Sequence, residues 1–169
     1  MIHIRKASLN DYQPLLSLFD EIDAYHREHL PHLFQKPNGP AREYDYFAEL
    51  IADEGVGFFV AESATQLLGF AYAMIRDTPD IPILIPRRFA VVDTVVVRSA
   101  HQRQGIGKML MNSIQTWALA KGATSIELTV YEFNQGAIAF YESLDYQSLH
   151  RRMTKSLDGD NMENLGKAE

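Results

Sequence analysis

A pair of glycines, Gly105 and Gly107, interrupts the stretch 91–111, VVDTVVVRSAHQRQGIGKMLM, between a β-branched apolar run and a segment with helical periodicity. Because glycine has no Cβ, the backbone there can curve tightly and bring several N–H groups close to one anion. A helix that begins at this point adds the positive end of its dipole. The stretch therefore predicts a strand, a phosphate-binding loop and a helix.

Two other interpretations of the glycine pair are open at this point. A Gly-x-Gly between a strand and a helix is also compatible with an ordinary tight turn. A nucleoside-triphosphate loop would need a wider glycine spacing and a metal-binding Ser or Thr after the lysine, whereas Met109 follows Lys108 here. The polyphosphate interpretation depends on what surrounds the loop.

Two side chains are candidates for proton transfer. Asp93 is an acid inside an otherwise apolar strand, and strict alternation places it on the same face as Val95 and Val97. A half-buried carboxylate there can accept a proton, directly or through water, and it can equally be a structural cap of a neighbouring loop. Tyr141 can donate a proton, although its helical periodicity is also typical of a core aromatic.

Three histidines, His26, His29 and His32, form the other conspicuous group, in the segment YHREHLPHLF. Their spacing is compatible with a metal site, but Pro31 interrupts the helix, and neither a cysteine nor an HExxH pattern accompanies them. Solvated loop histidines are the simpler interpretation.

Composition limits the possible classes of protein. The chain has 169 residues, 46% of them hydrophobic and 22% charged, which is the size and balance of one domain with a proper core. A formal charge of −6 argues against a nucleic-acid binder. The chain has no cysteine, which excludes disulfides, thiolate metal sites and cysteine nucleophiles. It has no membrane-spanning run and no signal-peptide pattern, so a cytoplasmic location is predicted.

The hydrophobic pattern predicts an α/β fold in which helices cover both faces of a mixed sheet. Strands are expected at residues 2–5, 58–62, 67–75, 89–97, 125–130 and 146–154. Helices are expected after Asp11, over 42–53, from the glycine loop to about Gly122, and over 135–144. Prolines predict a loop over 77–88, and the polar residues 156–169 predict a frayed C-terminal tail.

Several motifs together resemble the GNAT superfamily of acyl-CoA N-acetyltransferases. They are the strand, loop and helix with Gln102-x-x-Gly105-x-Gly107, then Asn134, then Phe140-Tyr141-Glu142 before Leu144-Asp145-Tyr146. The resemblance covers residues 58–153 well. It implies one domain over residues 1–155, with a mixed, mostly antiparallel sheet that is splayed at a coenzyme A site. Gln102 departs from the family, which more often has Arg there.

The resemblance also implies roles for the motif residues. In such enzymes this loop binds the pyrophosphate of coenzyme A, here through backbone N–H groups of Arg103, Gln104, Gly105, Ile106, Gly107 and Lys108, next to Gln102. The strand end at Val95, Val96 and Val97 would pair with the pantetheine arm and stabilise the oxyanion. Asn134 would contact the cofactor by its amide, and Tyr141 would protonate the departing thiolate. Asp93 is the candidate general base.

The implied activity is direct transfer of an acetyl group from acetyl-CoA to a primary amine of a small molecule or of a peptide or protein, without a metal. The alternative of a different class is a non-catalytic acyl-CoA-binding sensor on the same fold. The histidine segment, with Glu21, Asp23 and Glu28, would border the acceptor, where acidic groups suit a cationic amine. Exposed strand edges in this fold also favour pairing into a homodimer.

Overall fold

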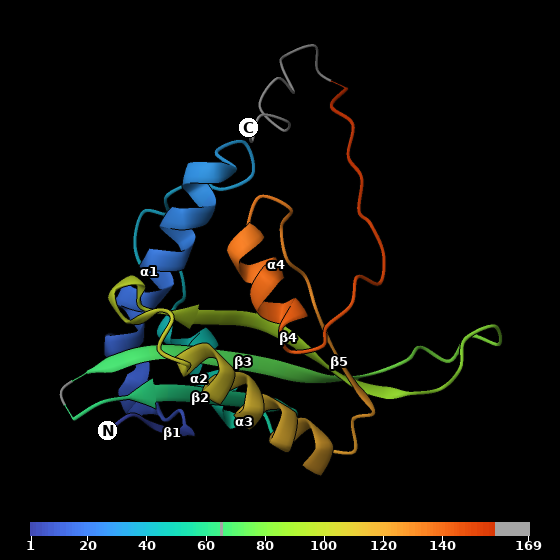
Figure 1. Cartoon of the computed structure of the whole chain (residues 1–169), viewed down its shortest axis with the longest axis horizontal. Helices are drawn as coiled ribbons and strands as arrows, with labels where there is room; N and C mark the ends of the chain where they lie inside the picture. Colours follow the sequence, from blue (N-terminus) through green and yellow to red (C-terminus); the bar gives the residue numbers. More distant parts are fainter. Residues whose placement is uncertain (65, 158–169) are drawn as a thin grey trace. The chain divides into compact units, whose positions relative to one another are not determined.

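A five-stranded sheet organises the structure, a computed structural model in which residues 1–64 and 66–157 are described (Figure 1). Its strands follow the order β1-β2-β3-β4-β5. They are β1 at His3–Lys6, β2 at Val56–Glu62, β3 at Leu67–Asp77, β4 at Arg88–Val97 and β5 at Ser125–Leu128. The first four pair antiparallel, and β5 pairs parallel to β4. The mixed, mostly antiparallel sheet is therefore confirmed.

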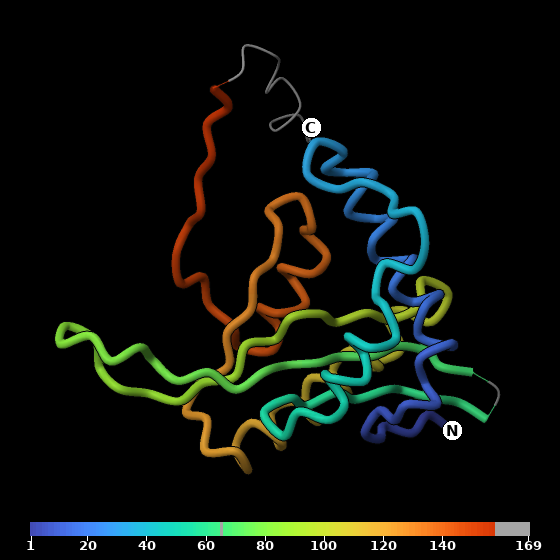
Figure 2. Tube along the Cα trace, turned by 180° about the vertical axis from the view of Figure 1, so that it is seen from behind, coloured from blue at the N-terminus to red at the C-terminus, as the bar shows by residue number. Residues whose placement is uncertain are grey.

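Helices cover both faces of this sheet, as predicted. Residues from Met1 to Phe133 form one compact unit, which contains the sheet with α1 (Tyr12–His29), α2 (Tyr44–Ala52) and α3 (Ile106–Ala120). The second unit begins at Asn134 and contains α4 (Gln135–Glu142). In the first unit, α1 and α2 lie on one face of the sheet and α3 on the other, as the views from the front and from behind show (Figures 1 and 2).

Two apolar layers hold the helices on the sheet. On the face of α1 and α2, the core includes Phe19, Phe47, Phe70 and Val96, none more than 5% exposed. Burial of side chains of this size provides about 1.5 to 3 kcal/mol each and fixes the angle at which the helices lie.

On the other face, the buried side chains of α3 recur at helical spacing. They are Ile106, Leu110, Ile114 and Trp117, which form an apolar stripe and agree with the helical periodicity expected after the glycine loop. A Cβ at Gly57 of β2 would overlap the ring of Trp117, so glycine permits this close approach. The stripe begins at the first residue of α3, so the start of the helix is anchored to the sheet.

The predicted strand over residues 146–154 is wrong. Residues 145–157 form neither helix nor strand in the structure. Alternating side chains specify a strand only where a neighbouring strand supplies a hydrogen-bond ladder, which periodicity does not reveal. Most of the expected frayed tail, residues 158–169, lies outside the described residues.

An ion pair beneath α1 fixes the beginning of the helix. Asp11 is 5% exposed, and the Arg5 guanidinium donates to both of its carboxylate oxygens at 2.8 Å. The Ser8 N–H donates to the same carboxylate at 2.7 Å, and Arg5 also reaches Glu62 at 2.8 Å. The hydrogen bond from Arg5 lowers the pKa of Asp11 below its ordinary value, so the pair is charged at neutral pH.

Replacing Asp11 by Asn is expected to lower the free energy of unfolding by about 2 to 3 kcal/mol at neutral pH, because it breaks a largely buried pair. Since the pKa of Asp11 is lowered in the folded state, its contribution is complete above the ordinary carboxyl range and is lost as the pH falls. Urea unfolding should therefore show that the difference in free energy of unfolding between variant and wild type becomes smaller at acidic pH. Asp20→Asn, at an exposed position of α1, is the control.

Candidate active site

Strands β4 and β5, at one side of the sheet, part halfway along β4. Their ladder runs from Phe89 opposite Ser125 to Val92 opposite Leu128 and ends there, while β4 continues to Val97 (Figure 1). Beyond the parting, β4 is paired with β3 alone among the described residues. The outer backbone edge of its last five residues is therefore open to an extended ligand, which could add to the sheet as a strand does.

A β-bulge lies at Asp93, at the start of this open edge. The register between β3 and β4 shifts here, so that Asp93 is an extra residue beside Thr94, which opposes Tyr72. The Tyr72 hydroxyl donates to Oδ2 of Asp93, and the Thr94 hydroxyl donates to the same oxygen at 2.9 Å. The carboxylate therefore lies on the face of Tyr72, and Asp93 is exposed.

The expected position of Asp93 was wrong in two respects. Opposed residues of a ladder point to one face, and Val95 and Val97 oppose Ala71 and Gly69, on the face opposite to Tyr72. Asp93 does not share their face, because the bulge breaks the alternation from which that expectation followed. It is also exposed rather than half-buried, which leaves the carboxylate accessible to a substrate.

The glycine loop has the backbone conformation of an anion-binding loop. Arg103 and Gly105 both take positive φ, 61° and 81°, and α3 begins at the next residue with Gly105 as its N-cap. Alternate left-handed residues turn neighbouring N–H groups toward one point. No side chain in the described part of the chain caps α3, so N–H groups of its first turn face outward. Arg103, Gln104 and Lys108 are exposed around them.

Three side-chain contacts fasten this loop to the rest of the unit. The Gln102 amide donates to the Val97 carbonyl at 3.2 Å, and Arg98 donates to the Ser17 hydroxyl of α1 at 2.9 Å. The Ser99 N–H donates to the Glu21 carboxylate at 2.7 Å. Gln102, which was expected beside the cofactor, thus braces the loop against the end of β4. Sequence reasoning missed the contacts made by Arg98 and Ser99, since they join segments far apart in the chain.

The resemblance to the GNAT superfamily implies that this loop binds coenzyme A, so replacing Gly105 by Ala is expected to raise the Kd for coenzyme A about tenfold and to cost about 1 to 2 kcal/mol of stability. A Cβ at this glycine meets nothing within 4 Å, so the cost arises from the positive φ alone. Isothermal titration with coenzyme A and thermal unfolding measure the two effects. Gly39→Ala is the control, because Gly39 also has positive φ and open space but lies in a loop away from α3. An unchanged Kd in Gly105→Ala would contradict the assignment of the loop.

In the second unit, Asn134 and Tyr141 lie at the two ends of α4. The Asn134 side-chain oxygen accepts the Ala137 N–H at 3.1 Å and caps the helix, so its amide NH₂ is the group left to donate to a ligand. The Tyr141 ring lies 5.8 Å from that of Tyr146. Burial, with a smaller effect of Tyr146, raises the pKa of the Tyr141 hydroxyl to about 12. Tyr141 therefore stays protonated at neutral pH, as a proton donor must.

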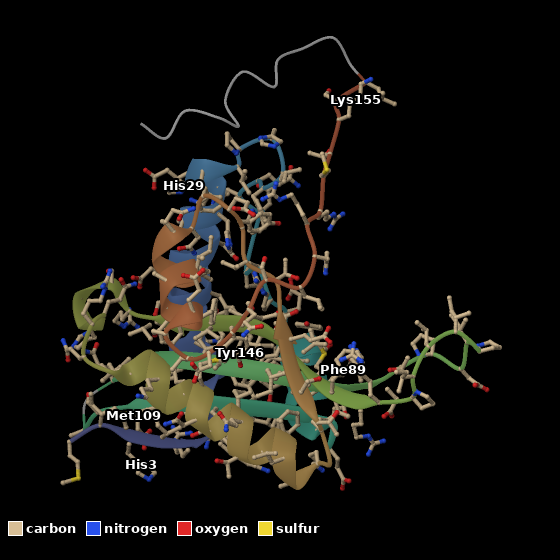
Figure 3. The ribbon with its side chains drawn as sticks, turned by 45° about the vertical axis from the view of Figure 1, so that its right-hand side comes forward. His3, His29, Phe89, Met109, Tyr146 and Lys155 are labelled. Carbon is tan, nitrogen blue, oxygen red and sulfur yellow. The ribbon has the colours of Figure 1, made fainter. Side chains whose placement is uncertain are left out.

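The histidines at the end of α1 pack as aromatic rings. His29 stacks on Phe133 at 4.5 Å, and His26 stacks on Phe34 at 5.1 Å (Figure 3 labels His29). Burial lowers the pKa of His26. His29 and His32 are exposed, in agreement with the interpretation as solvated histidines, although His29 also makes ring contacts, whereas His26 is partly buried. The described residues also contain no group of three or more His, Cys, Asp or Glu side chains arranged to hold a metal.

Two of the three acids expected beside an acceptor are engaged within the protein. Asp23 pairs with Arg42 at 2.6 Å, and Glu21 accepts the Ser99 N–H. Arg42 also lies over the Phe19 ring at 4.9 Å, so the pair fastens the loop between α1 and α2 to α1. Glu28 is exposed. Asp23 and Glu21 therefore hold neighbouring segments to α1.

Comparisons with known proteins agree with this fold. The sequence model described as the acetyltransferase (GNAT) family matches residues 17–146. N-acetyltransferase 8 of Rattus norvegicus is 32% identical over 104 residues, 61% of this chain and 45% of that protein. The chain thus spans less than half the length of this relative.

In the described chain, no helix combines the length and apolar character that crossing a membrane requires.

Solved structures share the fold at low sequence identity. A mutant of the BH1408 protein from Bacillus halodurans aligns with a TM-score of 0.87 and 24% identity, over 92% of this chain and 99% of that one. Aminoglycoside N-acetyltransferase AAC(6')-Iy, in complex with CoA, aligns with a TM-score of 0.69 and 15% identity, over 94% and 95%. The motifs, the parted sheet and the family match lead to one conclusion: this chain belongs to the acetyltransferase (GNAT) family.

Proposed function

We propose that the chain is an N-acetyltransferase that moves an acetyl group from acetyl-CoA directly to a primary amine of a small molecule, a peptide or a protein. One observation carries the proposal: the open edge of β4 is followed, after a short 3-10 turn at Ser99–His101 and the glycine loop, by a start of α3 that has no side-chain cap among the described residues. The extended pantetheine arm of a cofactor can pair with the open edge of β4, and its pyrophosphate can bind at the start of α3. The relative described above with bound CoA has the same fold.

The loop provides charge as well as geometry for the pyrophosphate. Backbone N–H groups from Arg103 to Lys108 would bind it, and the exposed side chains of these two residues add positive charge in a chain of net charge −6. Val95, Val96 and Val97 would pair with the pantetheine arm, and Asn134 would donate its amide NH₂ to the cofactor. Gln102 would act indirectly, through its bond to the end of β4.

The proposed reaction uses two side chains. Asp93 accepts a proton from the acceptor ammonium, and the neutral amine nitrogen attacks the thioester carbonyl carbon. A backbone N–H near Val95 to Val97 stabilises the resulting oxyanion. The carbon–sulfur bond then breaks as the intermediate collapses, and the thiolate takes the proton of the Tyr141 hydroxyl. The second proton of the attacking nitrogen passes through water to the Tyr141 oxygen, which leaves a neutral amide and a protonated tyrosine, and Asp93 releases its proton to solvent. The chain has no cysteine to form a thioester with the acyl group, which favours direct transfer in a ternary complex.

Two further properties stay predictions from the sequence. They are a cytoplasmic location, without nucleic-acid or membrane partners, and pairing into a homodimer through exposed strand edges. Size-exclusion chromatography with light scattering would test the second.

Release of free thiol tests the function. Purified protein is mixed with acetyl-CoA and a panel of amines, namely an aliphatic diamine, an amino sugar, an α-amino acid and a lysine-containing peptide. We expect thiol release that depends on both substrates. Binding of coenzyme A without amine-dependent release would instead support a non-catalytic acyl-CoA-binding module.

A further inference from the structure

We infer that Tyr72 is a positioning residue for Asp93, whose buried hydroxyl fixes one carboxylate oxygen and leaves the other to receive the proton of the acceptor amine. The inference rests on the proposed function, in which Asp93 is the general base. It assigns a role to a side chain on β3 that belongs to none of the motifs in the sequence.

Tyr72 is a rigid donor. It is 3% exposed, and its ring stacks on Phe58 at 5.0 Å with an interplanar angle of 18°. Phe70 and the rest of the core on this face of the sheet enclose the two rings. Because packing sets both side-chain torsions of Tyr72, the position of its hydroxyl is determined by the core and not by solvent.

Both hydrogen bonds to Asp93 reach the same oxygen. Tyr72 and Thr94 each donate to Oδ2, while Oδ1 receives no hydrogen bond from the part of the chain that the structure describes. An exposed aspartate in a bulge could otherwise occupy several rotamers. The two donors select one of them, so the free oxygen is held in one direction, and a fixed direction favours reaction with a bound amine.

Tyr72 itself is unsuited to be the base. Burial and the hydrogen bond to Asp93 raise the pKa of its hydroxyl well above the ordinary value, so the hydroxyl remains a donor. The neighbouring phenol of Tyr46 on α2 acts in the same direction. The competing explanation is purely structural, namely that a core tyrosine uses a nearby carboxylate to satisfy its buried hydroxyl.

A double-mutant cycle separates the two explanations. Tyr72→Phe is made in the wild type and in Asp93→Asn, and kcat, KM for the amine and KM for acetyl-CoA are measured in each. We expect Tyr72→Phe to lower kcat about tenfold when Asp93 is present and less than about twofold when it is absent, with KM for acetyl-CoA unchanged in both. A structural defect would instead lower activity by the same factor in both backgrounds, and that result would overturn the inference.

Two further variants complete the test. Tyr12→Phe is the matched control: Tyr12 is 8% exposed and its hydroxyl donates to the Arg42 carbonyl at 2.9 Å, so its loss should affect both backgrounds equally. If Tyr72→Phe fails to fold, Thr94→Val must show the same dependence on Asp93, and additive effects there would overturn the inference. A wild type without turnover would overturn the proposed function together with it, whereas an active wild type with additive effects would overturn the inference alone.

Discussion

Replacing Tyr141 by Phe is expected to lower kcat for acetyl transfer about 100-fold and to leave the Kd for coenzyme A within about twofold. The variant keeps the ring and removes only the hydroxyl. Because burial raises the pKa of that hydroxyl to about 12, Tyr141 is protonated throughout the neutral range and can deliver its proton to the thiolate. Steady-state kinetics with saturating acetyl-CoA and amine measure the loss. In mildly alkaline solution the Tyr141 hydroxyl is still protonated, so its deprotonation should not lower the kcat of the wild type there.

Tyr146→Phe provides the control for this experiment. Tyr146 follows α4, its ring lies near that of Tyr141, and burial also raises the pKa of its hydroxyl. Its removal should leave kcat nearly unchanged, since no role in proton transfer is assigned to it. If Tyr141→Phe retained the kcat of the wild type, Tyr141 would be a core aromatic, as its helical periodicity alone suggested.

Replacing Asp93 by Asn is expected to lower kcat/KM for the amine about 100- to 1,000-fold at neutral pH. An alkyl ammonium, with a reference pKa of about 10.4 as for lysine, must lose a proton before it can attack, and the variant cannot accept one. The loss of kcat/KM should become smaller as the pH approaches the pKa of the amine, because the amine is then already deprotonated in solution and does not need Asp93. The profile of kcat/KM against pH for wild type and variant measures this.

Asp80→Asn controls for the loss of one negative charge. Asp80 is an exposed acid in the loop between β3 and β4, outside the proposed machinery. It should not alter the profile. A deficit in Asp93→Asn that stayed constant up to the pKa of the amine would show that Asp93 binds the acceptor or supports the bulge without taking its proton.

The sequence predicted best what depends on neighbours in the chain. Gly105 and the apolar stripe of α3 lie within one local segment, so glycine chemistry and helical periodicity sufficed to predict a tightly curved loop followed by a helix, and Gly105 has positive φ in the structure. The strands expected at residues 58–62 and 67–75 also lie within two local apolar runs, and they are present as β2 and β3. In each case the signal and the structure share the same few residues.

The features that were missed depend on pairing between distant segments. The bulge at Asp93 is set by its register with Tyr72, and no local pattern reveals where two strands shift. In the same way, His26 and His29 meet Phe133, which belongs to the segment after β5. Strict alternation therefore placed the Asp93 carboxylate on the wrong face of β4.

A labelled single turnover decides whether this chain passes an acetyl group from acetyl-CoA to an amine. Protein in excess over acetyl-CoA with an isotope-labelled acetyl group is mixed with each amine of the panel, and the label is separated into small-molecule, peptide and protein fractions. We predict label on an acceptor amine in amounts equal to the free thiol released. Coenzyme A binding with no label on any amine, or label retained on the protein as a covalent acyl group, would contradict it.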